Sequence, residues 1–289
     1  MRVIEGGSPH MDLFRELTDK QIQSITATGH YMTYQPGQVV FEEGQPADGL
    51  YIVLSGRVEI YRVDKYDGEY ILAKIGPNQV FGEIGFFMED RKRTASARAA
   101  VETRLLYLPR NPADLLREMR DLSAAMKLLQ NVICVLGERL QVVDQRKFTE
   151  DTVYVAPEKA LEPIERQLPS GLLKKFFVRK KLKPDEMLCW EGDESDGFYF
   201  IHSGELEVLK LDPHRKFKKL GVMKAPTVAG ELGYFTGELR AACLRALTPV
   251  DYTVFSGRDF EKLQKDQPLE ALKILYAAAQ LVANLIVSE

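Results

Sequence analysis

Two short stretches of the chain carry the same residue types at nearly the same spacing. Gly82-Glu83 is followed by Arg93, and Gly230-Glu231 is followed by Arg240. An arginine offers a planar fork of donors that suits a phosphate, and a carboxylate accepts hydrogen bonds from hydroxyl groups. A glycine lets the backbone come close to a ligand. Together these residue types indicate a site for a sugar phosphate.

The residues that follow the first glutamate support this interpretation. Residues 84–87 are apolar and predict one short helical turn, whose free amides would point towards an anion. We therefore expect a compact loop that runs from the glycine, through a helical turn, to the arginine.

Both stretches belong to a longer internal repeat with an offset of 148 residues. The arginines pair at an offset of 147, because one residue is missing between glutamate and arginine in the second copy. Since chance does not hold a register over such a length, the two halves are predicted to build the same structural unit. The matching residues include Pro36 and Pro184, Gly44 and Gly192, Asp48 and Asp196, and Tyr51 and Tyr199.

Each half reads as short strands separated by turns. Residues 39–41, 49–54 and 57–62 are rich in β-branched and aromatic residues, as are residues 198–202 and 205–210 in the second half. Many short strands with regular turns predict a small antiparallel barrel or sandwich. Helical spacing is expected over residues 12–27, 111–146 and 268–287.

The repeat and the helices divide the chain into two domains. We expect a first domain over residues 12–147 and a second over residues 168–289. The segment between them, residues 148–167, contains Pro157 and Pro163 and little periodicity, so it is the predicted linker.

Composition excludes several classes of protein. The chain has 289 residues, a net charge of −3 and no apolar run long enough to span a membrane. Its three cysteines and four histidines are scattered, so neither a metal site nor a disulfide framework is expected, and a cytoplasmic location is predicted. No nucleophile–base arrangement or pair of catalytic carboxylates is recognisable, so we expect no enzyme.

Both stretches resemble a motif of a known protein family. Phe81-Gly-Glu-Ile-Gly with Arg93-Thr-Ala, and Gly230-Glu-Leu-Gly with Arg240-Ala-Ala, are similar to the phosphate-binding cassette of cyclic-nucleotide-binding domains. The resemblance covers roughly residues 12–146 and 168–287. It implies a mainly β fold with flanking helices, built as two tandem β-roll (jelly-roll-like) barrels, each followed by C-terminal helices.

The resemblance also implies the roles of individual residues. In the family the glutamate binds the ribose 2′-hydroxyl and the arginine binds the cyclic phosphate, which here would be Glu83 with Arg93 and Glu231 with Arg240. The flanking residues would supply backbone or small-residue contacts. They are Gly82, Ile84, Gly85, Thr94 and Ala95 in the first half, and Gly230, Leu232, Gly233, Ala241 and Ala242 in the second.

The two cassettes resemble different branches of the family. The first is similar to that of bacterial catabolite activators, and the second is similar to that of the regulatory subunits of cAMP-dependent protein kinase. In the family, a threonine after the arginine is compatible with cGMP. Thr94 therefore leaves cGMP open in the first site, whereas Ala241 favours cAMP in the second.

Structural alternatives exist for each of these residues. The glutamate and arginine of a cassette could form an internal ion pair in a barrel without a ligand. Arg98 and Arg245, five residues after each cassette arginine, are predicted to form structural salt bridges, and Trp190 is predicted to lie in the barrel core. Tyr276 either packs in a core or stacks on a purine.

We expect the chain to be a stand-alone sensor for cAMP, or for cGMP at its first site, that regulates a separate partner protein allosterically. A homodimer through residues 111–146 or 268–287 is a further expectation, and nucleic acid is not expected as a partner. The basic residues within 173–183 and 214–219 are interpreted as a solvated rim or a protein-docking surface. The alternative is a ligand-free tandem barrel that acts as a protein-interaction scaffold.

Overall fold

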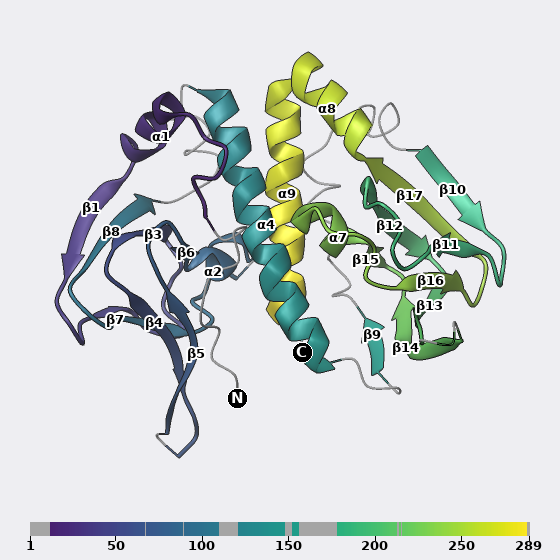
Figure 1. The fold of residues 1–289 in the computed structure, drawn as a ribbon, viewed down its shortest axis with the longest axis horizontal. Coiled ribbons are helices and arrows are strands. Elements are labelled where there is room, and N and C mark those ends of the chain that lie inside the picture. Colours follow the sequence, from purple (N-terminus) through teal and green to yellow (C-terminus); the bar gives the residue numbers. More distant parts are fainter. Residues whose placement is uncertain are drawn as a thin grey trace. The chain divides into compact units, whose positions relative to one another are not determined.

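The computed structural model describes residues 12–66, 68–88, 90–109, 121–147, 152–155, 178–212, 214 and 216–287. The chain divides into two compact units, Met1–Val135 and Leu136–Glu289. The first unit is drawn in purple and blue in Figure 1, and the barrel of the second in green. Each unit therefore contains one of the two sequence repeats.

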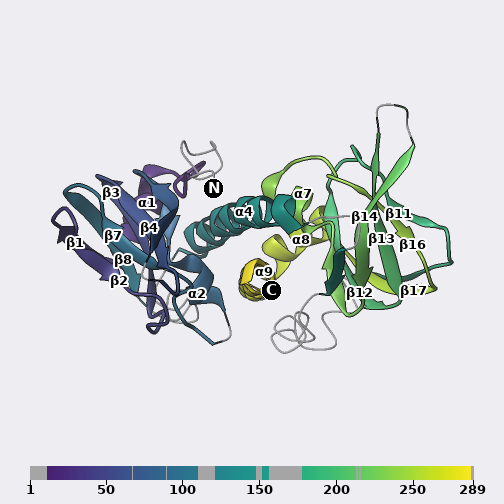
Figure 2. The ribbon, with the colours of Figure 1, turned by 90° about the horizontal axis from the view of Figure 1, so that it is seen from below.

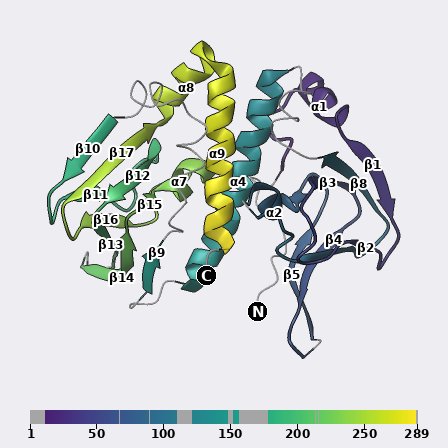
Figure 3. The same cartoon turned by 180° about the vertical axis from the view of Figure 1, so that it is seen from behind.

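The first unit holds a barrel of two antiparallel sheets with four strands each. One sheet has the strand order β1-β8-β3-β6 and the other has the order β2-β7-β4-β5. The β4–β5 hairpin extends from the end of the barrel (Figure 3). The strands are β1 (His30–Tyr34), β2 (Val39–Phe41), β3 (Gly49–Ser55), β4 (Val58–Val63), β5 (Glu69–Ile75), β6 (Val80–Phe81), β7 (Ser96–Ala99) and β8 (Thr103–Pro109).

The second unit repeats this topology strand for strand. The order β10-β17-β12-β15 corresponds to the first sheet, and β11-β16-β13-β14 corresponds to the second. Figure 2 shows β11, β13, β14 and β16 together in the second barrel. The strands are β10 (Val178–Leu182), β11 (Met187–Cys189), β12 (Gly197–Ser203), β13 (Glu205–Leu211), β14 (Phe217–Lys224), β15 (Thr227–Ala229), β16 (Cys243–Ala246) and β17 (Val250–Ser256). The prediction of a mainly β fold with two tandem β-rolls and flanking helices is confirmed.

One strand lies where a linker was expected. Within the predicted linker 148–167, the structure describes β9 (Thr152–Val155), which pairs in parallel with β14 and extends the second sheet to five strands. Its residues Thr-Val-Tyr-Val are β-branched or aromatic, which suits an edge strand. The remaining residues of that segment lie outside the described part of the chain.

Each barrel encloses its own hydrophobic core. The core of the first barrel is rich in aromatic residues, whereas that of the second contains smaller side chains at several matching positions. Members of the first core are Phe41, Tyr51, Val53, Val58, Ile75, Phe81, Ala97 and Leu105. Members of the second are Cys189, Ile201, Leu206, Val208, Met223, Ala229, Leu244, Ala246, Val250 and Tyr252.

The helix predicted over residues 12–27 begins later, as α1 (Asp19–Thr26). The reason is a capping box: the Thr18 side chain accepts from the amide of Gln21, and the Gln21 side chain accepts from the amide of Thr18. The residues before the cap are anchored elsewhere, since the Asn131 side-chain amide donates to the carbonyls of Leu13 and Arg15, at 2.8 and 2.9 Å.

The other helices follow the barrel strands in sequence. The helix α4 (Leu122–Lys147) accounts for most of the helical pattern predicted over residues 111–146, of which 111–120 lie outside the described residues. The helix α9 (Pro268–Val287) has the predicted bounds, and it starts at a proline, which is favourable in the first turn. It is preceded by α8 (Gly257–Asp266), whose N-cap Ser256 accepts from the amide of Asp259. Among the described helices, none combines the length and the apolar character that a membrane crossing requires.

Candidate functional site

The first cassette is formed where β6 ends and a short helix begins. Gly82 has a left-handed backbone (φ 76°) and caps α2 (Glu83–Phe87), the helical turn predicted from the sequence. A Cβ atom at Gly82 would also lie only 2.6 Å from Nη1 of Arg93. Glycine is therefore required here both for the turn and for the approach of the arginine. Glu83, the first residue of α2, is completely buried.

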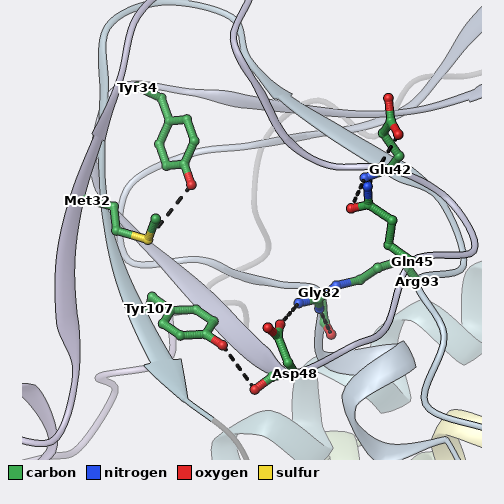
Figure 4. Close-up of polar contacts among 8 residues, drawn as sticks. All are labelled: Met32, Tyr34, Glu42, Gln45, Asp48, Gly82, Arg93 and Tyr107. Carbon is green, nitrogen blue, oxygen red and sulfur yellow. Dashed lines mark hydrogen bonds and ion pairs between the residues drawn. The ribbon is translucent and has the colours of Figure 1, made fainter.

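Arg93 is held against this turn by its two terminal nitrogens. Nη1 donates to the carbonyl oxygen of Gly82 at 3.0 Å, and Nη2 donates to Oδ1 of Asp48 at 3.3 Å (Figure 4). Only 3% of Arg93 is exposed, while 59% of the Asp48 side chain is exposed. The buried Nε atom has no hydrogen-bond partner among the described residues. The buried guanidinium thus keeps donor capacity that the Gly82 carbonyl and the Asp48 carboxylate do not fill.

Aromatic rings surround the same guanidinium. Its carbon lies 4.2 Å from the ring centroid of Phe41 and 5.4 Å from that of Tyr51, both within reach of a cation–π interaction. Burial lowers the pKa of Arg93, and the neighbouring Tyr51 and the carboxylate of Asp48 oppose this. Burial also raises the pKa of Tyr51 to about 12. Tyr51 therefore stays neutral at neutral pH, and Arg93 keeps its charge because arginine does not deprotonate in proteins.

The second cassette repeats the backbone of the first but gives its arginine different partners. Gly230 (φ 75°) caps α7 (Glu231–Thr236), and Nη1 of Arg240 donates to the carbonyl of Gly230. Nη2 donates to the carbonyl of Gly197 at 2.7 Å and to the hydroxyl of Tyr199 at 3.4 Å. Arg240 is 4% exposed and Glu231 is buried. Each arginine and its glutamate therefore come from the same short loop.

Asp196, the counterpart of Asp48, is farther from its arginine. Its Oδ1 lies 3.9 Å from Nη2 of Arg240, and 86% of its side chain is exposed. Arg240 thus meets mainly neutral oxygen atoms, whereas Arg93 donates to a carboxylate.

The remaining predicted site residues line the two loops. Gly85 is buried against the carbonyl of Lys92, where a Cβ would come within 2.2 Å of the oxygen. Gly233 is buried against the side-chain hydroxyl of Ser195, which a Cβ would approach to 2.1 Å. Ala95 is buried, Ile84, Thr94 and Ala242 are half-buried, and Ala241 is exposed. Leu232 lies within α7, but its side chain is outside the described part of the structure.

Two arginines outside the cassettes have structural partners, as predicted. Arg98 binds Glu59 at 3.1 Å and Glu69 at 2.6 Å, and Arg245 binds Glu207. These pairs lie on barrel strands, so Arg98 and Arg245 are suitable reference residues for the cassette arginines.

Sequence reasoning missed two kinds of site residue. Asp48 and Asp196 recur at the repeat offset, but an Asp-Gly pair between two strands predicts only a turn. Phe41 was placed in a strand without a role, because its contact with Arg93 arises from the fold. The repeat register was the available signal for the aspartates, since it aligned them with the glycines and tyrosines of both loops.

Metal-ligating side chains and thiols are the other groups that could do chemistry. Within the described ranges, no group of three or more His, Cys, Asp or Glu side chains is arranged to hold a metal ion. Cys189 and Cys243 are buried, and burial raises the pKa of the Cys189 thiol to about 11. A thiolate nucleophile at neutral pH is therefore not expected at this position.

Comparison with known proteins identifies several relatives. A cGMP-dependent protein kinase of Caenorhabditis briggsae is 23% identical over 277 residues, which span 95% of the chain but 33% of that kinase. The type II regulatory subunit of the cAMP-dependent protein kinase of Drosophila melanogaster is 26% identical over 253 residues, which span 87% of the chain and 59% of that subunit. The chain therefore spans a third to three-fifths of the length of these relatives.

Bacterial proteins and solved structures are also similar to it. The cyclic AMP receptor protein of Thermus thermophilus is 32% identical over 138 residues, which span 48% of the chain and 60% of that protein. A structure of the regulatory domain of Toxoplasma gondii PKA with cAMP is 18% identical, with a TM-score of 0.33, over 91% of the chain and 90% of that domain. The sequence pattern of the cyclic nucleotide-binding domain matches residues 31–119 and 179–267, so the chain belongs to the cyclic nucleotide-binding domain family and contains this domain twice.

Proposed function

We propose that the chain is a receptor that binds one cyclic nucleotide in each barrel and, without catalysing a reaction, regulates a separate partner protein. The observation that carries the proposal is a buried arginine in each cassette, held by a left-handed glycine beside a buried glutamate. Burying a charged group is costly unless it is paired and hydrogen-bonded. An anion between this loop and the arginine would supply that pairing.

The chemistry of each pair suits a cyclic nucleotide. The fork of the arginine binds the phosphate, and the glutamate accepts from the ribose 2′-hydroxyl, as the family resemblance implies. The relatives include kinases and regulators named for cAMP and for cGMP. We propose cAMP at the second site, where Ala241 follows the arginine, and cAMP or cGMP at the first, where Thr94 does.

Isothermal titration with cAMP and with cGMP tests the proposal. We expect two sites per chain, of which Arg93→Ala removes one and Arg240→Ala removes the other. Losing a charge-assisted hydrogen bond costs about 1.5–3 kcal/mol, or about 13- to 160-fold in affinity. The matched controls are Arg98→Ala and Arg245→Ala, which break ion pairs on barrel strands outside the cassettes and should leave both sites intact. Unchanged stoichiometry in both cassette variants would show that the ligand binds elsewhere.

A ligand-free scaffold is the second candidate, and one observation favours it for the first barrel. Arg93 already has an internal carboxylate partner in Asp48 and an aromatic ring at 4.2 Å. A ligand that binds the native state must raise the unfolding temperature. If the chain is a ligand-free scaffold, neither nucleotide should produce heat on titration or raise that temperature. Recovery of the added nucleotide unchanged after incubation excludes turnover.

A signal requires that the ligand prefer one conformation of the protein over another. We propose that the helices that follow each barrel provide these conformations. Dimerisation through residues 111–146 or 268–287 remains a prediction, which light scattering with and without cAMP tests.

A further inference from the structure

The second barrel displays two large aromatic side chains on its surface. Trp190, the only tryptophan of the chain, follows β11 and is 46% exposed. Phe217 opens β14 and is 42% exposed, and the centroids of the two rings lie 6.1 Å apart. The prediction that Trp190 belongs to the barrel core is therefore wrong. Cys189 points into the core instead, and the alternation of a strand turns its neighbour outwards.

The first barrel has glutamates at the same two places. At the repeat offset of 148, Trp190 corresponds to Glu42 and Phe217 corresponds to Glu69, both of them exposed. Glu69 binds Arg98 at 2.6 Å. In the second barrel the matching arginine, Arg245, lies instead 5.6 Å from the ring centroid of Phe217. An ionic contact has thus been replaced by a cation–π contact, and a polar surface has become aromatic.

The surroundings of this pair carry positive charge. Arg245 is paired with Glu207, and Lys210 is paired with Glu191 at 3.8 Å. Two further cations, Lys216 and Lys219, are exposed beside Phe217 in the sequence and form no ion pair with any residue in the described ranges. Around Phe217 the exposed Lys216, Lys218 and Lys219 outweigh the nearby Asp212. Beside Trp190, the Asp193 side chain accepts from the Trp190 amide and makes the rim acidic. The surface therefore has an apolar centre and a rim that is cationic on the Phe217 side only.

We propose that Trp190, Phe217 and Arg245 form a docking surface for an acidic polypeptide segment that carries an apolar or aromatic anchor. Tryptophan and arginine are the residue types that most often dominate the binding energy of protein interfaces. The rings would bury the anchor, and the lysine rim would attract its carboxylates and speed the encounter. None of these residues belongs to either cassette, so the surface is independent of the proposed nucleotide sites.

A single-stranded nucleic acid is the less suitable occupant. Bases stack on accessible ring faces, but here the two rings are packed against each other with an interplanar angle of 31°. The cations also lie on the Phe217 side only, since the Trp190 side carries Asp193, whereas single-stranded nucleic acids are bound in grooves whose positive charge follows the backbone. Such a divided rim suits a polypeptide that places its carboxylates beside the lysines better than a chain with a charge on every unit.

The fluorescence of the single tryptophan gives a direct test on the full chain. The probes are a random copolymer of glutamate and tyrosine, polyglutamate as the partner without an anchor, and a short oligothymidylate. We expect the copolymer to change the emission of Trp190 saturably and to bind about tenfold or more tightly than either other probe. Equal binding of polyglutamate would overturn the need for an anchor, and tighter binding of the oligothymidylate would assign the surface to nucleic acid.

Substitutions with the residues of the first barrel sharpen this test. Phe217→Glu and Trp190→Glu place on the second barrel what the first already carries there, so the fold should tolerate them. Each should weaken binding of the copolymer about tenfold or more by isothermal titration, whereas Tyr66→Glu, at an exposed aromatic residue of the first barrel, should not. No saturable binding by the native chain, or undiminished binding by both variants, would overturn the proposal.

Discussion

The two barrels share one backbone design but differ in what lies beside the cassette arginine. In the first barrel, Phe41 and Phe81 stack with Tyr51, and Phe41 contacts Arg93. At the matching positions the second barrel has Cys189 and Ala229. Two aromatic rings are therefore absent from the second core, and Tyr252, at the place of Leu105, restores only part of their volume.

The difference extends to electrostatics. Arg93 donates to the carboxylate of Asp48 at 3.3 Å, whereas Arg240 donates to the neutral carbonyl of Gly197 at 2.7 Å. The charge of the first arginine is thus partly compensated within the protein, and that of the second is less so. Two cassettes with the same motif therefore need not bind an anion equally, and we expect the second to bind it more tightly.

The largest effect is expected from removing a ring that only the first barrel has. Phe81 is fully buried, so Phe81→Ala should leave a cavity and cost about 3–5 kcal/mol of unfolding free energy in the first barrel. Scanning calorimetry should show the unfolding transition of that barrel moving to a lower temperature.

The matching change in the second barrel runs in the opposite direction. Ala229→Phe adds a ring to a core built around smaller residues, and overpacking should cost about 1–3 kcal/mol. A stabilising effect would mean that the second core has unfilled space beside Arg240.

Alkaline pH should lower the stability of the second barrel more than that of the first at this core position, because Phe41 cannot titrate and its counterpart Cys189 can. Burial raises the pKa of Cys189 from 9.0 to about 11 in the folded chain. The folded state therefore holds the thiol proton more tightly than the unfolded state. The part of the unfolding free energy that depends on this proton is fully present below pH 9 and is lost between pH 9 and about 11. The expected loss is about 2 kcal/mol from the second barrel.

The control for that measurement is Cys189→Ala, which lacks the thiol but keeps the tyrosines that also ionise at alkaline pH. The difference in stability between the native chain and this variant should shrink as the pH rises from 8 to 10.5. A constant difference over this range would indicate that the thiol is accessible to water in the folded state.

The sequence predicted the residues of the two cassettes better than the residues that surround them. The repeat register located both glycine–glutamate pairs and both arginines, because residues that must adopt one backbone geometry recur at one offset. It did not reveal that Asp48 binds Arg93, since Asp-Gly also satisfies a turn and the contact joins residues 45 positions apart.

The prediction that placed Trp190 in the core was wrong for a related reason. A large aromatic residue beside a strand is usually expected in the core. In a strand of only three residues, however, the sequence does not show which side chains face the core and which face solvent. The start of α1 was equally ambiguous, because the helical spacing continues before Thr18, whose capping box ends it.

Ligand selectivity offers a smaller effect that also distinguishes the sites. The carbonyl of Thr94 accepts from Nε and Nη2 of Arg62 at 2.9 and 2.7 Å, and its hydroxyl forms no hydrogen bond with any residue the structure describes. Thr94→Ala should therefore weaken cGMP at the first site by about 0.5–1.5 kcal/mol, or about 2- to 13-fold, and change cAMP less. In the second site, Ala241→Thr should strengthen cGMP selectively. Equal effects on both nucleotides would remove Thr94 from the selectivity argument.

The smallest expected effect tests the electrostatic half of the comparison. A phosphate at the first site would have to compete with Asp48 for Nη2 of Arg93, so Asp48→Asn should strengthen nucleotide binding there. Because the Asp48 side chain is mostly exposed, the gain should be only about 0.2–1 kcal/mol, or about 1.4- to 5-fold. Titration at low salt gives the best resolution, since screening weakens such a charge contact.

Asp196→Asn is the matched control, and it should change the second site less. Its carboxylate lies 3.9 Å from Nη2 of Arg240, and that nitrogen already donates to the carbonyl of Gly197. If both substitutions strengthened binding equally, the aspartates would act through long-range electrostatic repulsion of the phosphate and not through the hydrogen bond to Arg93. If Asp48→Asn weakened binding instead, Asp48 would hold Arg93 in its binding position, and the first barrel would need its internal ion pair to recognise the ligand.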